Sequence, residues 1–142
     1  MAYAIDIIKK YEGLSLKAYK CPAGINTIGY GTTVYPDGTP VKMGDTITKE
    51  KAEALLLDYV INKILPHIRD LNLTDNQQAA LCSLIYNVGW PAFSKSKCYK
   101  AIKEKDWETV FKNWDWCKGS GKFLLGLAKR RTEELHLFFQ DL

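Results

Sequence analysis

The sequence predicts an α+β domain in which a small antiparallel sheet lies near one end of a mostly helical chain. Two observations lead to this prediction. Residues 16–34 are rich in β-forming side chains and are interrupted by glycine and proline, whereas the chain after Gly44 repeats apolar residues at helical spacing. The 142 residues have the length of one domain. We expect residues 13–46 to form a β-rich lobe, and residues 1–12 and 47–142 to form a helical lobe with a connecting helix.

The N-terminal segment has the pattern of a short helix with one buried face. Its apolar residues recur at intervals of three and four, at Ala4, Ile7, Ile8 and Tyr11. Gly13 is a natural stop for this helix. Glu12 is therefore expected where the first helix gives way to the next element.

The β-rich stretch is predicted to hold two or three short antiparallel strands. β-Forming residues gather at positions 18–19 and 25–30, and the Pro-Asp-Gly sequence at residues 36–38 is a strong turn signal. Gly29 and Gly31 flank Tyr30, which indicates that the backbone approaches another group closely there.

Two long helices are predicted to follow. Thr48 can cap the first, which bridges the sheet and the rest of the molecule, and Pro66 interrupts its pattern. Thr74 and Gln77 have the spacing of a capping box and open a helix that is apolar over more than half its surface. We interpret it as the central core helix, ending at Gly89.

The C-terminal part is predicted to contain further helices. Ser94 or Ser96 can start one, and Asp106 can cap the next. Residues 118–122 are expected to form a loop before the last helix. A cleft is expected between the β-rich and helical lobes, because binding sites favour such junctions.

The composition narrows the possible partners without choosing one. A net charge of +4 suits an anionic polymer such as a nucleic acid, a lipid surface or a cell wall. The four cysteines and two histidines show no zinc or iron–sulfur spacing, so we expect neither a metal nor a cofactor. The N-terminus lacks an apolar run of the length that a signal peptide or membrane anchor needs.

Three reactive residues stand at uneven spacing in residues 12–33, which begin at the expected end of the first helix and continue into the β-rich stretch. Eight residues separate Glu12 from Cys21, and five separate Cys21 from Thr27. Taken singly, each has an ordinary interpretation as a surface acid, a small buried thiol or a strand residue. Together they offer an acid, a nucleophile or base, and a hydroxyl.

This spacing, with its context, resembles the phage-type lysozymes, the T4 lysozyme-like endolysins of glycoside hydrolase family 24. That family carries Glu, then Asp or Cys, then Thr at the same intervals. Further similar segments follow in the same order: TIGYG at residues 27–31, YNVG at 86–89, FSKS at 93–96 and GLAKRRTEE at 126–134. The resemblance spans nearly the whole chain and implies a lysozyme-like fold.

The resemblance also implies an activity. The chain is expected to hydrolyse the β-1,4 bond between N-acetylmuramic acid and N-acetylglucosamine in bacterial peptidoglycan. Glu12 would be the general acid and Thr27 would position water, while Cys21 assists as base or nucleophile, which leaves inversion or retention open. Many relatives carry His directly after the second glycine, whereas this chain has Thr32.

The same resemblance implies substrate-binding residues on both lobes. Tyr86 can stack on a sugar, and Asn87 can donate and accept hydrogen bonds. At least one of the two arginines is expected in the cleft. The implied residues are Thr33, Tyr86, Asn87, Ser96, Asn113, Arg130 and Arg131.

Two other hypotheses for the function stay open. One is a lytic transglycosylase of related fold, which needs only the acid, and the other is a non-catalytic cell-wall-binding domain. The lysines are scattered without a nucleic-acid-binding pattern, so no nucleic-acid partner is expected. We expect a monomer without stable membrane insertion, held in the host cytoplasm until a holin releases it to the cell wall in the periplasm.

Overall fold

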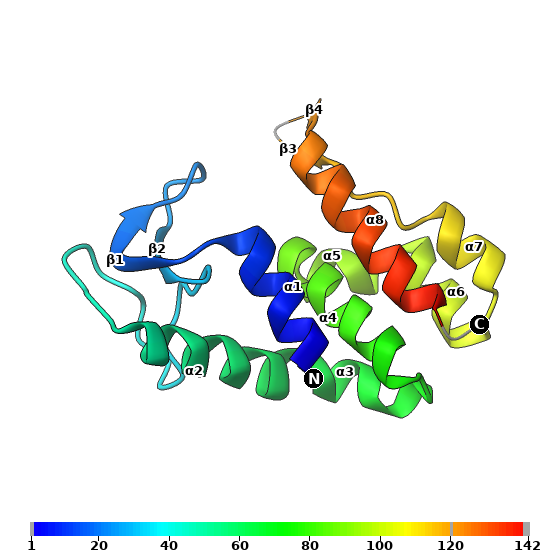
Figure 1. The fold of residues 1–142 in the computed structure, drawn as a ribbon, viewed down its shortest axis with the longest axis horizontal. Helices are drawn as coiled ribbons and strands as arrows, with labels where there is room; N and C mark the ends of the chain where they lie inside the picture. Colours follow the sequence, from blue (N-terminus) through cyan, green and yellow to red (C-terminus); the bar gives the residue numbers. More distant parts are fainter. Residues whose placement is uncertain (1, 120, 141–142) are drawn as a thin grey trace.

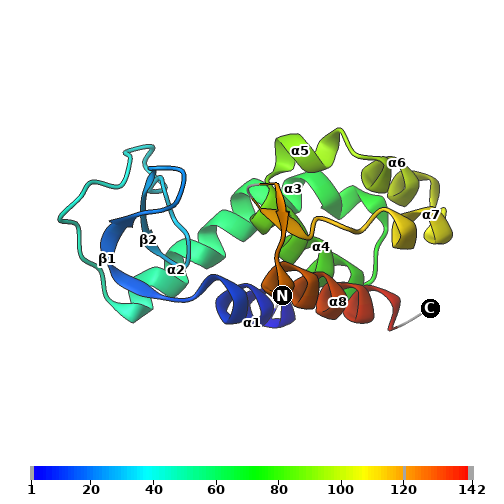
Figure 2. The same ribbon diagram turned by 90° about the horizontal axis from the view of Figure 1, so that it is seen from above.

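The computed structural model describes residues 2–119 and 121–140. Its shape is elongated, with strands β1 (Ser15–Lys20) and β2 (Asn26–Gly29) at one end and most helices at the other (Figure 1). Helix α2 (Lys49–Tyr59) runs between the two ends, as Figure 2 shows from above. We call the end with β1 and β2 the sheet lobe, and the other end the helical lobe.

Helix α1 (Ala2–Glu12) begins the helical lobe and leads into the sheet lobe. Ala4 and Ile8 are fully buried on the face that meets the core, as their spacing predicts. The helix ends at Gly13, whose φ of 71° is the left-handed conformation that glycine adopts without strain. Glu12 is therefore fixed at the last turn of a helix whose other turns are packed.

The sheet lobe is built on an antiparallel pair. Strands β1 and β2 pair with Tyr19 opposite Thr27 and Lys20 opposite Asn26. The turn between them is closed by Cys21, whose N–H donates to the Ile25 carbonyl at 3.0 Å. The predicted two or three strands are thus two strands, extended by isolated bridges such as Ile28 with Thr32.

The connecting helix is capped as predicted but continues differently. Thr48 accepts a hydrogen bond from the Lys51 N–H at 3.1 Å. After Tyr59 the chain forms a π-helical segment, η1 (Val60–Ile64), then helix α3 (Leu65–Ile68) and a 3₁₀ turn, η2 (Arg69–Leu71). Pro66 does not break this path, because it lies in the first turn of α3, where its missing N–H is not needed.

Helix α4 (Asp75–Val88) is the central helix of the core, as predicted. Its capping box is present, since the Thr74 hydroxyl accepts from the Gln77 N–H while the Gln77 side chain accepts from the Thr74 N–H. Helices α1 and α8 (Leu125–Phe139) pack against it. Two buried side chains of α4 are polar, Gln77 of the capping box and Ser83, whose partners are described below.

The remaining helices of the described chain are short. Helix α5 (Trp90–Ser94) precedes α6 (Lys97–Glu104), which Ser96 caps in preference to Ser94, and α7 (Trp107–Lys112) is capped by Asp106.

One expectation about the backbone is wrong. Residues 118–119 and 122 do not lie in a loop, because β3 (Lys118–Gly119) pairs antiparallel with β4 (Lys122–Phe123). Gly121 takes a left-handed φ of 76° in this hairpin, which allows so tight a reversal. The hairpin projects beyond the start of α8 (Figure 1).

Candidate active site

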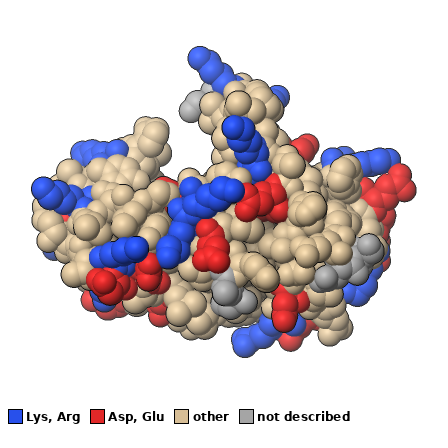
Figure 3. Space-filling view, viewed as in Figure 1, with Lys and Arg blue, Asp and Glu red and all other residues tan. Residues whose placement is uncertain are grey.

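The surface is hollowed between the two lobes. Figure 3 shows this hollow between the sheet lobe and the column formed by the β3–β4 hairpin and the start of α8. The end of α1 and the chain that leads to β1 run along its floor (Figure 1). Glu12 therefore lies at the lobe junction, where the sequence predicts the cleft.

Glu12 is held in an ion pair with Arg130 of α8. The Arg130 Nη1 donates to Glu12 Oε2 at 2.6 Å, and the arginine side chain is 3% exposed whereas the glutamate is 21% exposed. A charge-assisted bond between partly buried groups fixes the carboxylate more firmly than a surface pair. Oε2 of Glu12 is thus hydrogen-bonded to a residue of the helical lobe.

The other oxygen of Glu12 faces the sheet lobe at Gly31. A Cβ at this position would lie 3.3 Å from Glu12 Oε1 and 3.5 Å from the Tyr86 hydroxyl. Gly31 also has a φ of 99°, which side chains rarely adopt. The close backbone approach expected around Tyr30 is therefore an approach to the acid.

Tyr86 of α4 joins the two lobes. Its hydroxyl donates to the Tyr30 carbonyl at 2.6 Å, and its ring packs edge-on against Tyr59 with centroids 5.4 Å apart. Burial raises the pKa of Tyr86, and the nearby Glu12 carboxylate adds to this. The hydroxyl is thus a neutral donor that is already used, so the sugar-stacking role predicted for Tyr86 has to rest on its remaining ring surface.

Two other tyrosines offer more open aromatic surface. Tyr19 is 40% exposed and Tyr59 is 45% exposed, and both are close enough to Tyr86 to influence its pKa. Tyr59 stands at helical spacing from Leu55 and Leu56, so its exposure differs from the buried position that this periodicity predicts. Neither tyrosine belongs to a motif. The sequence could have indicated them as binding residues only because each is an aromatic residue near the predicted lobe junction.

Cys21 and Thr27 lie together in the sheet lobe. Backbone hydrogen bonds at Ile25 and Ala23 lower the pKa of the Cys21 thiol, and the Thr27 side chain lowers it further. Thr27 is only 5% exposed, and its hydroxyl donates to the Ile25 carbonyl at 2.9 Å. Polar groups that surround a half-buried thiol in this way favour its thiolate form.

The other predicted binding residues are dispersed. Asn87 follows Tyr86 at the end of α4, and Thr33 lies in the sheet lobe, where its carbonyl accepts from Val41. The Ser96 hydroxyl is used as the cap of α6, and the Asn113 amide donates to the Thr109 carbonyl.

Arg131 does not line the cleft. Its side chain is 2% exposed, and its Nη2 donates to Glu134 Oε2 at 2.9 Å inside the helical lobe. Burial lowers the pKa of this guanidinium. Of the two arginines proposed for the cleft, only Arg130 contacts a residue of the site.

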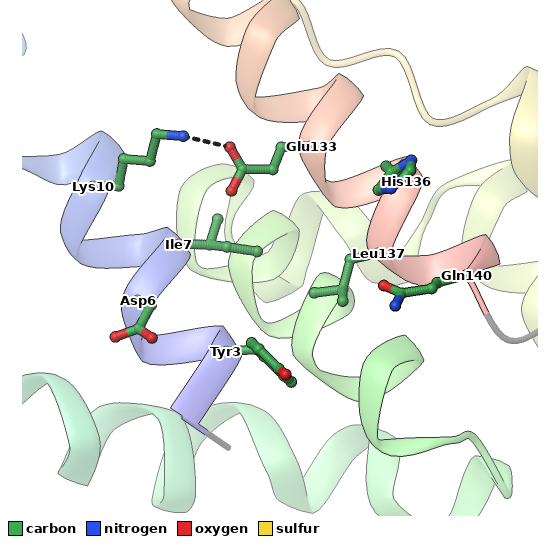
Figure 4. Close-up of a pocket in the computed structure, with 8 residues that line it drawn as sticks. All are labelled: Tyr3, Asp6, Ile7, Lys10, Glu133, His136, Leu137 and Gln140. Carbon is green, nitrogen blue, oxygen red and sulfur yellow. Dashed lines mark hydrogen bonds and ion pairs between the residues drawn. The ribbon is translucent and has the colours of Figure 1, made fainter.

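A second hollow lies between α1 and α8, away from Glu12. Figure 4 shows its lining, in which Lys10 pairs with Glu133. Neither Cys21 nor Thr27 is among the described residues that line it, so we do not assign it to the site. Within the described ranges, no group of three or more His, Cys, Asp or Glu side chains is placed to hold a metal ion. All four cysteines are free thiols.

Known proteins share this chain's sequence and fold. The family model described as phage lysozyme matches residues 9–134. An endolysin from Acyrthosiphon pisum secondary endosymbiont phage 1 is 41% identical over 139 residues, covering 93% of this chain and 92% of its own length. The solved endolysin from Escherichia coli O157:H7 phage FAHEc1 is 35% identical, with a TM-score of 0.85 over 100% of this chain and 94% of that one.

A solved muramidase domain is also similar. The muramidase domain of SpmX from Asticaccaulis excentricus is 31% identical, with a TM-score of 0.81 over 98% of this chain and 96% of that one. The chain therefore belongs to the phage lysozyme family, and it is a glycoside hydrolase of the endolysin type.

Proposed function

We propose that this enzyme hydrolyses the β-1,4 bond between N-acetylmuramic acid and N-acetylglucosamine in bacterial peptidoglycan and thereby lyses the phage's host. The observation that carries the proposal is the placement of Glu12 at the lobe junction, held by Arg130 at 2.6 Å. The name muramidase of a relative with the same fold supports the choice of bond.

Glu12 acts as the general acid. Because Arg130 donates to Oε2, the proton that Glu12 transfers has to sit on Oε1, the oxygen that faces Gly31. Transfer of this proton to the glycosidic oxygen lets the leaving sugar depart with a neutral hydroxyl as its bond to the anomeric carbon breaks. Arg130 keeps the other oxygen fixed and so sets the direction of transfer.

The sheet lobe supplies the second function. As base, the Cys21 thiolate takes a proton from a water that Thr27 holds, and the resulting hydroxide bonds to the anomeric carbon with inversion. As nucleophile, the thiolate itself bonds to that carbon, and water later displaces it with overall retention. The buried, polar setting of Thr27 beside the thiol supports the first route, in which the hydroxyl orients water.

The cleft binds a glycan strand through aromatic and polar groups. Tyr19 and Tyr59 present their exposed rings to sugars, and Tyr86 contributes the edge of its ring. Thr33 and Asn87 provide hydrogen bonds from the sheet lobe and from α4.

The endolysin relatives support a proposal for the release route. We propose that the enzyme acts as a monomer, waits in the host cytoplasm, and reaches the cell wall in the periplasm through a holin. In the part of the chain that the structure describes, none of the helices combines the length and apolarity needed to cross a membrane.

The product end group tests the activity. A hydrolase releases a reducing N-acetylmuramic acid end, whereas a lytic transglycosylase leaves an anhydro-sugar, so mass spectrometry of digested peptidoglycan separates the two. Glu12→Gln removes the transferable proton without changing the shape of the side chain. If this variant still clears a cell-wall suspension, the catalytic proposal fails and the binding-domain alternative gains support.

A further inference from the structure

A second glutamate lies behind the Glu12–Arg130 pair, in the interior of the helical lobe. Glu134 of α8 is 0% exposed. Its carboxylate accepts hydrogen bonds from the Ser83 hydroxyl, from Trp114 Nε1 at 3.1 Å and from Arg131 Nη2 at 2.9 Å. Both oxygens therefore face donors only, as the ionised form requires.

Glu134 reaches Arg130 directly and through Ser83. Arg130 Nε lies 3.4 Å from Glu134 Oε2, and the same Nε donates to the Ser83 hydroxyl oxygen at 3.2 Å. Because Ser83 gives its proton to Glu134, its lone pairs stay turned to Arg130. The Ser83 carbonyl accepts a hydrogen bond from Arg130 Nη2 at 3.0 Å, so Ser83 binds the guanidinium through both its side chain and its backbone.

The guanidinium of Arg130 thus spans two carboxylates. Its Nε side faces Ser83 and Glu134, while its Nη1 faces Glu12. A planar guanidinium transmits orientation from one edge to the other, which a flexible ammonium group cannot do.

Stability alone does not explain this arrangement. Burial raises the pKa of the Glu134 carboxyl, although Arg131 and Ser83 oppose the rise. Buried ionic clusters are often no more stable than well-packed apolar side chains of similar volume. A cluster that lies one side chain away from Glu12 therefore points to a role in the site.

We propose that Glu134 is a positioning residue, which fixes Arg130 through Ser83 and so aims Glu12 at the glycosidic oxygen. The proposal rests on the hydrolase function proposed above. It assigns to Glu134 an effect on turnover rather than on substrate binding, because Glu134 lies in the interior and has no surface that a sugar can touch.

Glu134→Gln is the informative change. The amide keeps the size of the side chain but turns one acceptor into a donor, which then opposes the Ser83 hydroxyl or Arg131. If Ser83 rotates to accept from the amide, its proton faces Arg130, and the guanidinium loses its fixed partner. A displaced catalytic contact of this kind lowers kcat by ~10- to 100-fold, and KM stays within about twofold because the cleft surface is unchanged.

The experiment measures reducing-end release from purified peptidoglycan with wild type and four single variants. Glu134→Asp keeps the charge and is expected to lose less activity than Glu134→Gln. Glu53→Gln removes a carboxylate whose ion pair with Lys9 lies outside the site. Phe138→Leu lowers stability in the same lobe without removing a polar group. Thermal unfolding of each variant sets an assay temperature at which all are folded.

A double variant separates positioning from general damage. If Glu134 acts through Arg130, adding Glu134→Gln to Arg130→Lys costs little further activity, whereas independent effects multiply.

Each outcome supports or overturns the proposal. An unchanged kcat in folded Glu134→Gln, a loss matched by Phe138→Leu, or multiplicative losses in the double variant would overturn it. If wild type itself releases no reducing ends, the proposed function fails, and this result is distinct because it does not depend on position 134.

Discussion

Replacing Cys21 tests the chemistry assigned to the sheet lobe. Backbone hydrogen bonds at Ile25 and Ala23 lower the pKa of its thiol. The thiolate is therefore present at lower pH than that of an ordinary cysteine, and activity that needs it falls as the pH drops through the lowered value. Serine does not ionise in this range. We expect Cys21→Ser to reduce kcat by ~10²- to 10⁴-fold, the usual contribution of a general base.

Cys21→Asp is the complementary substitution, which we expect to keep the activity that Cys21→Ser loses. A free aspartate carboxyl has a pKa of about 3.9, below that of a free cysteine thiol. The carboxylate stays available as base at pH values where the thiolate is already protonated. We expect Cys21→Asp to keep activity and to shift the acidic limb of the pH–activity profile to lower pH, while the alkaline limb stays in place.

The assay is reducing-end release from purified peptidoglycan over a pH series. Cys117→Ser serves as control, because Cys117 is also a half-buried free thiol but lies in the helical lobe. Cys82 and Cys98 are buried, and burial raises the pKa of each to about 12, so we expect neither to react with thiol reagents in the folded enzyme. Full activity in Cys21→Ser, or an acidic limb that does not move in Cys21→Asp, would refute a chemical role for the thiol.

Three further changes probe the junction. Arg130→Lys leaves one cation that cannot face Glu12 and Ser83 together, so kcat falls by ~10-fold or more in the same assay. Tyr86→Phe leaves the Tyr30 carbonyl unpaired and lowers the free energy of unfolding in urea by about 1–2 kcal/mol. Gly31→Ala and its control Gly24→Ala both strain a left-handed φ, at a cost of about 1 kcal/mol each. Only Gly31→Ala crowds Glu12 Oε1, so only this variant loses kcat, and equal kcat in the two would contradict the close approach.

Local signals predicted the helix ends well. Thr48, Thr74 and Asp106 cap helices where their sequence context places them, because each cap is satisfied by an N–H three residues away. Gly13 and Gly89 end helices for the equally local reason that they adopt positive φ. Signals of this range need no knowledge of the rest of the fold.

The individual contacts between distant residues of the site were not predicted, although at least one of Arg130 and Arg131 was expected in the cleft. Arg130 is 118 positions from Glu12, and Ser83 is 51 positions from Glu134, so no periodicity links them. A weak signal existed, because Arg130 and Arg131 stand four and three residues before Glu134 on one helix, and Ser83 interrupts an apolar segment of another. The exposure of Tyr59 was also not predictable from local sequence, because it depends on which face of its helix the rest of the fold covers.

Thr32 follows Gly31 directly, at the position where many relatives carry histidine. It pairs through its backbone with Ile28. Glu12 is held by Arg130, and α1 and α8 both pack on α4, so the acid and its support belong to the helical lobe. Cys21 and Thr27 belong to the sheet lobe. The distance between Glu12 and Cys21 therefore depends on how the two lobes are arranged, whereas the contact that orients Glu12 lies within the helical lobe. If the two residues act as proposed, a change in the arrangement of the lobes would alter the step assigned to Cys21 and leave the Glu12–Arg130 contact in place.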